Sequence, residues 1–149
     1  MSIDVPAGMR KSVEIAATQA YRSAEAEPEW PYGPNIAHRV PVCGLVSSLM
    51  LRQLVAMGYE VQQEIRRGVE DINEHSYLLI DPAEMQIVAD ATWQQFVPGE
   101  VWTPDLPKVL IGDRQDVVEQ AKRRGVEEKW LTLWQERPLK WAWGVTRHT

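Results

Sequence analysis

Residues 75–90 read HSYLLIDPAEMQIVAD, two short β-rich runs that flank an Asp-Pro turn. This pattern predicts an antiparallel β-hairpin with a four-residue turn over Asp81–Glu84. In that register His75 and Asp90 stand directly opposite each other on the two strands. Opposed side chains point to the same face of a hairpin, with Cβ atoms roughly 4.5–5.5 Å apart. The sequence therefore predicts a contact between an imidazole and a carboxylate, in which the acid fixes the tautomer of the ring.

The strongest helical pattern lies upstream of this hairpin. Apolar residues recur at three- and four-residue steps from Leu45 to Met57, and Gly58 follows as a residue suited to ending a helix. We expect a helix of about 15 residues that begins near Val42 or Cys43. Unpaired N–H groups and the dipole at a helix N-terminus stabilise negative charge, so a thiol at this place is expected to have a lowered pKa.

The remaining patterns predict an α+β fold. In chain order they indicate a helix over residues 11–27, a Pro-rich loop over 28–41, a strand over 59–65, the hairpin, a short strand over 109–111 and helices over 115–124 and 127–136. Arg66-Arg67-Gly68 is expected to end the first strand, with Arg66 and Arg67 at a hairpin rim. Trp130 and Trp134 lie four apart on the last helix and are expected in the core. Helices, then antiparallel strands, then helices again are typical of the α+β class.

The composition is that of a single globular domain over residues 1–149. Hydrophobic residues make up 44% of the chain and charged residues 25%, which excludes a disordered protein. The net charge of −5 argues against nucleic-acid binding, which needs a dense basic surface. No apolar run approaches the roughly 18 residues of a membrane span. The first residues show no secretory signal, so we expect a cytoplasmic protein that binds neither nucleic acid nor membrane.

Cys43 is the one cysteine of the chain. A single cysteine excludes a disulfide framework and a zinc ribbon, and it leaves either a small buried apolar side chain or a nucleophile. The helix start, the room that Gly44 leaves beside the thiol, and the predicted His75–Asp90 pair favour the nucleophile. A metal site formed by Cys43, His75 and Asp90 is disfavoured, because an acid opposite the imidazole suits an orienting role better than ligation.

Three segments carry a resemblance to a known superfamily. They are Val42-Cys43-Gly44-Leu45, Glu74-His75-Ser76-Tyr77-Leu78 and residues 87–96, which read IVADATWQQF. A cysteine that opens a helix, followed by His and Asp on neighbouring strands, resembles the transglutaminase-like branch of the papain-like cysteine enzymes. The resemblance covers residues 41–96 and departs at Ala91, where Pro is frequent. It implies a papain-like core in which the helix bearing Cys43 packs on a small antiparallel sheet, with additional C-terminal helices.

The resemblance implies acyl chemistry through a thioester, with no cofactor and no metal. Cys43 would attack an amide, ester or thioester carbonyl, His75 would carry the proton, and Asp90 would hold the imidazolium. Water as the acceptor gives a hydrolase or a protein-glutamine deamidase, and an amine acceptor gives an acyltransferase. We expect a small-molecule, peptide or carrier-bound acyl substrate. The alternative is a catalytically silent binding module of the same fold.

The superfamily also supplies a second oxyanion donor from a side chain upstream of the cysteine. No Gln lies in residues 33–42, so the candidates are His38, Asn35 and Trp30, beside the backbone N–H groups at Gly44. Trp93 follows Asp90 closely and either walls the site or fills the core. This open choice of donor is what motivates the silent-module alternative.

Overall fold

The computed structural model of the chain describes residues 4–25, 43–69, 72–98 and 107–136. In chain order its elements are α1 (Ala7–Glu25), α2 (Cys43–Ala56), β1 (Val61–Val69), β2 (Ile72–Ile80), β3 (Ile87–Asp90), the short 3₁₀ helix η2 (Trp93–Phe96), β4 (Leu110–Gly112), α3 (Arg114–Arg123) and α4 (Glu128–Leu131). The α+β class is confirmed. The predicted Pro-rich loop over residues 28–41 lies outside the described residues.

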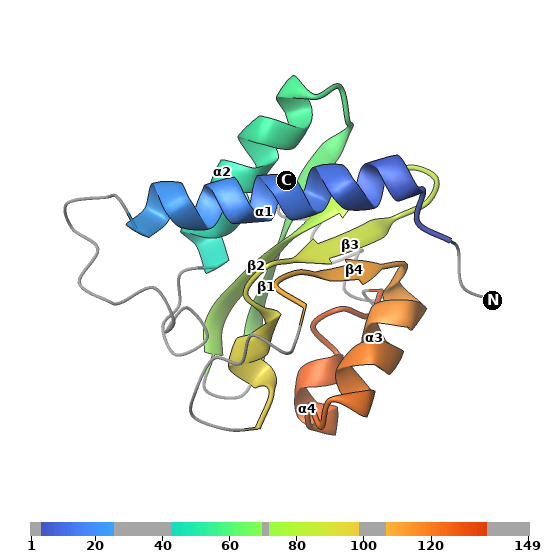
Figure 1. Cartoon of the computed structure of the whole chain (residues 1–149). Coiled ribbons are helices and arrows are strands. Elements are labelled where there is room, and N and C mark those ends of the chain that lie inside the picture. The colour runs from blue at the N-terminus through green and yellow to red at the C-terminus, as the bar shows by residue number, and fades with distance from the viewer. Residues whose placement is uncertain (1–3, 26–42, 70–71, 99–106, 137–149) are drawn as a thin grey trace, which may run out of the picture.

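The four strands form one antiparallel sheet in the order β1-β2-β3-β4. Figure 1 shows α1 and α2 on one side of this sheet, with α3 and α4 on the other. Leu78 and Ile80 of β2 pack with α1 and α2, whereas Tyr77 and Leu79 pack with α3 and α4. Because helices cover both faces, every residue of β2 from His75 to Ile80 is buried.

The helix that bears Cys43 is the best-predicted element. It begins at Cys43, and its buried residues Val46, Met50 and Leu54 recur at helical spacing against the sheet. Gly58 ends it with a φ of +99°, a left-handed conformation that costs glycine little. The N–H of Gly58 donates to the Val55 carbonyl and the N–H of Tyr59 donates to the Leu54 carbonyl, the two bonds of a Schellman motif.

The hairpin that joins β2 to β3 has a longer turn than the sequence predicts. Leu78 pairs with Ala89 and Ile80 with Ile87, so the turn spans residues 81–86 and the predicted four-residue turn is wrong. Asp81 and Gln86 adopt positive φ values of 52° and 51°, and the N–H of Gln86 donates to the Asp81 carbonyl at 2.9 Å. These two left-handed residues close a wider turn and take Met85 and Gln86 out of the strand.

The wider turn moves the register by two residues and leaves the faces unchanged. Continuing the observed register places Asp90 opposite Tyr77 rather than opposite His75. Side chains alternate along a strand with a period of two, so His75 and Tyr77 point to the same face. His75 and Asp90 are therefore diagonal neighbours on one face of the sheet.

Two further expectations about element ends are wrong. β1 does not end at Arg66, because Arg66 pairs with His75 and Arg67 with Glu74 in a ladder that runs to Val69. The side chain of Arg66 is 12% exposed, and its Nε donates to Glu64 Oε1 at 3.2 Å. An edge strand accepts such polar residues where a neighbouring carboxylate pairs with the cation.

The last helix is shorter than the predicted 127–136. α4 ends at Leu131, and the chain continues through tight turns in which the N–H groups of Leu133, Trp134 and Gln135 each donate to a carbonyl three residues earlier. Side chains from the sheet and from α3 donate to the carbonyl groups of these turns. Among the helices in the described ranges, none has the length and hydropathy that crossing a bilayer requires.

Candidate active site

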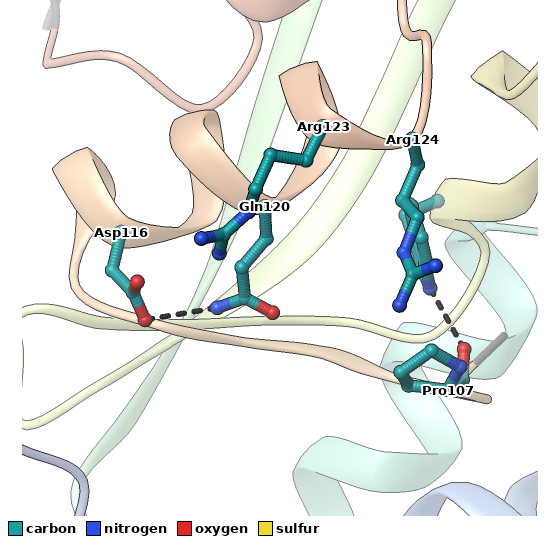
Figure 2. A pocket seen from close by; sticks show the side chains of 6 residues that line it. Pro107, Asp116, Gln120, Arg123 and Arg124 are labelled. Atoms are coloured by element: carbon teal, nitrogen blue, oxygen red, sulfur yellow. Dashed lines mark hydrogen bonds between the residues drawn. The ribbon is translucent and has the colours of Figure 1, made fainter.

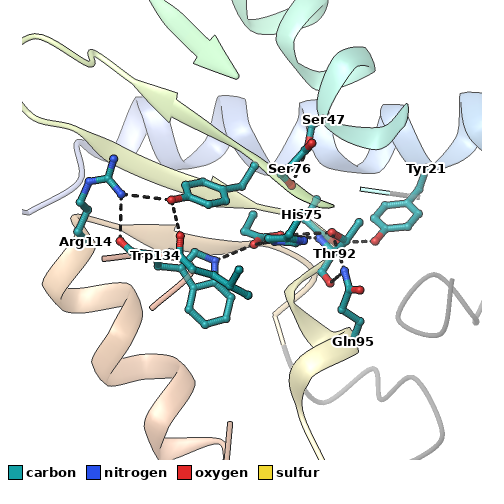
Figure 3. Close-up of polar contacts among 12 residues, drawn as sticks. Tyr21, Ser47, His75, Ser76, Thr92, Gln95, Arg114 and Trp134 are labelled. Atoms are coloured by element: carbon teal, nitrogen blue, oxygen red, sulfur yellow. Dashed lines mark hydrogen bonds and ion pairs between the residues drawn. The ribbon is translucent and has the colours of Figure 1, made fainter. Parts of the chain in front are cut away.

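His75 and Asp90 form a buried pair on the face of the sheet that α3 and α4 cover. The Nε2 atom of His75 lies 2.6 Å from Oδ2 of Asp90, and both side chains are 1% exposed. The predicted contact between this imidazole and this carboxylate is therefore confirmed, although the predicted register is not. Figure 3 shows His75 within a set of polar contacts, with Thr92 beside it and Trp134 nearby.

The carboxylate of Asp90 accepts hydrogen bonds on both oxygen atoms. Besides His75, the indole Nε1 of Trp134 donates to Oδ2 at 2.8 Å. The backbone N–H of Thr92 donates to Oδ1 at 3.0 Å, and the Thr92 hydroxyl lies 3.4 Å from the same atom. A buried carboxylate is costly unless donors surround it, and these contacts supply donors from three directions. The carboxylate is thus fixed in one orientation toward His75.

Aromatic side chains fix the ring of His75 from the sides. The ring of Phe96 meets it edge-on with centroids 4.9 Å apart, and the ring of Tyr77 lies at 5.9 Å with a tilt of 37°. Phe96 belongs to η2, which begins three residues after Asp90. The helix that follows the strand of Asp90 therefore also contributes a side chain that packs against the ring of His75.

Contacts from α1 and η2 hold the segment that follows Asp90. The hydroxyl of Tyr21 donates to the carbonyl of Ala91 at 2.5 Å, and Nε2 of Gln95 donates to the carbonyl of Thr92 at 3.0 Å. Ala91 and Thr92 are both buried. The backbone after the acid is thereby bound from both sides, and this keeps the Thr92 N–H directed at the carboxylate.

The first residue of α2 is Cys43, and the start of this helix lies beside β2. The hydroxyl of Ser47 donates to the carbonyl of Ser76, next to His75, at 3.2 Å. Residues four apart lie on one face of a helix about 6 Å apart along its axis. Ser47 therefore joins the first turns of α2 to the strand residue next to His75, and Cys43 lies one turn before Ser47 on this helix.

His75 and α2 lie on opposite faces of β2. His75 points to the face covered by α3 and α4, whereas α2 packs on the opposite face. The paired residues of β2 and β3 begin at Leu78, three residues after His75. In the described part of the chain, no strand pairs with His75 on the β3 side.

The other candidates have different outcomes. Gly44 is half-buried as the second residue of α2, and no described atom lies within 4 Å of the point where a Cβ would be. Trp93 is buried in the core around α3 and α4, and its Nε1 donates to the Pro107 carbonyl at 3.0 Å. Trp30, Asn35 and His38 lie outside the described residues.

A separate pocket of about 400 Å³ opens between α3 and the segment before β4 (Figure 2). Its lining residues are Trp93, Pro107, Asp116, Gln120, Arg123 and Arg124. Nε2 of Gln120 donates to Oδ2 of Asp116 at 2.8 Å, so these two side chains bind each other. The pocket contains neither His75 nor Asp90, and Trp93 is the one predicted site residue that lines it.

Trp134 is the functional candidate that the sequence analysis missed. Its spacing from Trp130 predicts core packing, and the side chain is fully buried as expected. A tryptophan expected in the core does predict a buried acceptor for its indole N–H, because a buried indole N–H needs a hydrogen-bond partner. No sequence pattern identifies Asp90 as that acceptor, because the two residues belong to separate elements.

No group of three or more His, Cys, Asp or Glu side chains within the described ranges has the arrangement of a metal site. Comparisons of the chain with protein-family models, curated proteins and solved structures gave no match.

Proposed function

We propose that this protein is a transglutaminase-like cysteine hydrolase or acyltransferase in which Cys43 forms a thioester. The observation that supports it best is the buried contact of 2.6 Å between His75 Nε2 and Asp90 Oδ2. A base oriented by an acid is the arrangement that activates a thiol nucleophile. The start of a helix at Cys43, beside the same strand, supplies the thiol.

The two nitrogen atoms of His75 have separate roles in this mechanism. Nε2 faces Asp90, so Nδ1 is the atom that exchanges a proton with the thiol of Cys43. Proton transfer from sulfur to Nδ1 gives a thiolate and an imidazolium, and Asp90 stabilises the imidazolium. The helix start stabilises the thiolate, since its backbone N–H groups lack partners within the helix.

Acyl transfer then follows in two steps. The thiolate adds to the substrate carbonyl, the carbon–sulfur bond forms, and the leaving group departs with the proton of the imidazolium. In the second step water or an amine adds to the thioester while Nδ1 takes a proton from this acceptor. The carbon–sulfur bond then breaks and restores the thiolate–imidazolium pair. In this proposal the backbone N–H groups at Cys43 and Gly44 bind the oxyanion, and Gly44 has no side chain to block the approach of the substrate.

Trapping of the acyl-enzyme tests this function. The protein is incubated with activated aryl esters and thioesters of short acyl chains, and its intact mass is measured. We expect one acyl group per chain, on Cys43, that hydroxylamine removes, and no adduct on Cys43→Ser. Water and a primary amine are then compared as acceptors to separate hydrolysis from acyl transfer. Absence of an adduct from a folded protein with all donors would contradict the proposal.

A further inference from the structure

The turns that follow α4 lie against the same face of the sheet as the His75–Asp90 pair (Figure 3). We call residues 131–135 the strap. The hydroxyl of Tyr77 donates to the Leu133 carbonyl at 2.6 Å, and Nη1 of Arg114 donates to the Trp134 carbonyl at 3.1 Å. Nη2 of Arg66 donates to the carbonyl of the last strap residue at 2.5 Å. Three side chains, from β1, β2 and α3, therefore hold the strap through its backbone.

Trp134 is the side chain of the strap that reaches the pair. It is fully buried, and its Nε1 donates to Asp90 Oδ2 at 2.8 Å, the same oxygen that contacts His75. Its ring also meets Phe96 edge-on at 5.8 Å, and Phe96 in turn meets His75 edge-on at 4.9 Å. The strap thus contacts the acid directly and the base through one aromatic ring.

The origin of the donors to Asp90 shows what Trp134 adds. Thr92 is two residues from Asp90 and His75 lies on the neighbouring strand, so both belong to the hairpin and the segment after it. Trp134 is 44 residues away in the chain and is the donor from outside that unit. Rotation of the carboxylate away from His75 would break the Trp134 bond at the same time.

We propose that Trp134 acts on His75 through Asp90: its N–H shares the negative charge of Oδ2 and so limits how strongly the carboxylate stabilises the imidazolium. Arg114 and the other strap contacts act on the pair through Trp134. The catalytic meaning of this inference rests on the proposed function. The coupling between Trp134 and the His75–Asp90 pair does not rest on the proposed function, because it follows from the hydrogen bonds of Asp90 alone.

The proposal predicts a defined change in the titration of His75. A donor to an ionised carboxylate withdraws negative charge from it, so loss of the Trp134 N–H leaves Asp90 a stronger acceptor for the imidazolium. Among the described residues, the charged side chains that act on Tyr77, whose ring lies beside that of His75, are Glu64 and Arg66 of β1 and Arg114 of α3. Trp134→Phe leaves all of them in place, so its effect reports the lost N–H.

The test is an NMR titration of the His75 ring protons in the full chain, which has only 3 histidines to assign. We expect the midpoint in Trp134→Phe to rise by about 0.5–1 pH unit. The matched control is Trp130→Phe, because Trp130 also packs on Phe96 but its ring meets Lys129 rather than Asp90. An unchanged or lowered midpoint in Trp134→Phe, or an equal rise in Trp130→Phe, would overturn the proposal.

Arg114→Lys tests the role of the strap, since it keeps the charge but removes the fork that binds the carbonyl groups. We expect a smaller rise of the midpoint that disappears in the Trp134→Phe background, whereas an additive rise would show that Arg114 acts independently. If Trp134→Phe does not fold, the Trp134 indole N–H resonance of the wild type is followed through the same pH titration instead. This resonance shifts with the midpoint of His75 if the coupling exists, and stays constant if the coupling does not exist. Failure of thioester formation at Cys43 would leave these results unchanged, so the two proposals fail separately.

Discussion

The imidazole of His75 and the carboxylate of Asp90 meet at 2.6 Å although the two residues are not cross-strand partners. Diagonal neighbours in an antiparallel pair lie roughly 7–8 Å apart at the backbone, so the contact depends on the two side chains reaching toward each other. Trp134 and Thr92 fix the acid, while Phe96 and Tyr77 fix the base. The contact between His75 and Asp90 therefore depends on these surrounding side chains as well as on the pairing of β2 with β3.

Asp90→Asn is expected to remove most of the acyl-transfer activity while the fold persists. The amide has the shape of the carboxylate but does not stabilise an imidazolium, so the rate of thioester formation should fall by about 100-fold or more. The rate is measured by intact mass, and folding is checked by thermal unfolding. Thr92→Val is the matched control: it removes the weak hydroxyl contact of 3.4 Å and keeps the backbone bond. A rate for Asp90→Asn equal to that of Thr92→Val would contradict a role for the charge.

Tyr77→Phe is expected to lower the stability of the protein at neutral pH. The Tyr77 hydroxyl donates to the Leu133 carbonyl and accepts from Nη1 of Arg114, and the side chain is fully buried. Loss of these bonds leaves a carbonyl without its donor, which costs about 1–3 kcal/mol. Urea unfolding measures the difference. A variant as stable as the wild type would show that the strap does not depend on this contact.

The same substitution changes the response to alkaline pH. Burial raises the pKa of Tyr77 above 10.0, against the opposing effects of the Arg66 and Arg114 charges. The folded state then holds the phenol proton more tightly than the unfolded state does. Stability is therefore complete below a pH of about 10 and falls as the pH rises through the folded-state pKa. Tyr77→Phe should lack this part of the decline, so the difference in unfolding free energy between the two proteins should narrow in alkaline solution.

Two glycine substitutions test how α2 ends. Gly58 has a φ of +99°, so Gly58→Ala should cost about 1 kcal/mol or more because an alanine is strained in that conformation. Gly8 lies within α1, with no atom within 4 Å of an added Cβ, and Gly8→Ala should be neutral or stabilising. Thermal unfolding compares the two. Equal effects would contradict the left-handed helix end.

Packing of α2 on the sheet is tested by Leu54→Ala. Leu54 is fully buried among the residues of α1, α2 and the sheet, so its truncation should cost about 2–5 kcal/mol. Val55 is next to it and 54% exposed, and Val55→Ala should change stability by less than about 0.5 kcal/mol. Similar losses for both would show that the helix presents a different face to the sheet.

The sequence predicted the elements whose signals are local. The spacing of Val46, Met50 and Leu54 and the following Gly58 located α2, because helical period and helix-end chemistry depend on near neighbours. The period-two alternation of the strands also predicted that His75 and Asp90 share a face. That prediction survived the wrong turn, since a shift of two residues preserves side-chain direction.

The parts that the sequence did not predict depend on tertiary contacts. The turn over residues 81–86 uses left-handed Asp81 and Gln86, and glutamine gives no signal for that conformation. The turns after α4 are held by distant residues such as Arg66 and Arg114, which donate to their carbonyl groups. The bond from Trp134 to Asp90 has the same origin, since packing of the strap on the sheet creates it.

The pH dependence of Cys43 alkylation, in the wild type and in His75→Gln, tests the central claim most directly. With one cysteine in the chain, iodoacetamide reports on a single thiol. The account predicts that the pKa of the wild-type thiol lies well below its usual value of about 8.5, and that His75→Gln restores an ordinary value. An ordinary or unreactive thiol in both proteins would contradict a thiolate–imidazolium pair and, with it, the proposed acyl chemistry.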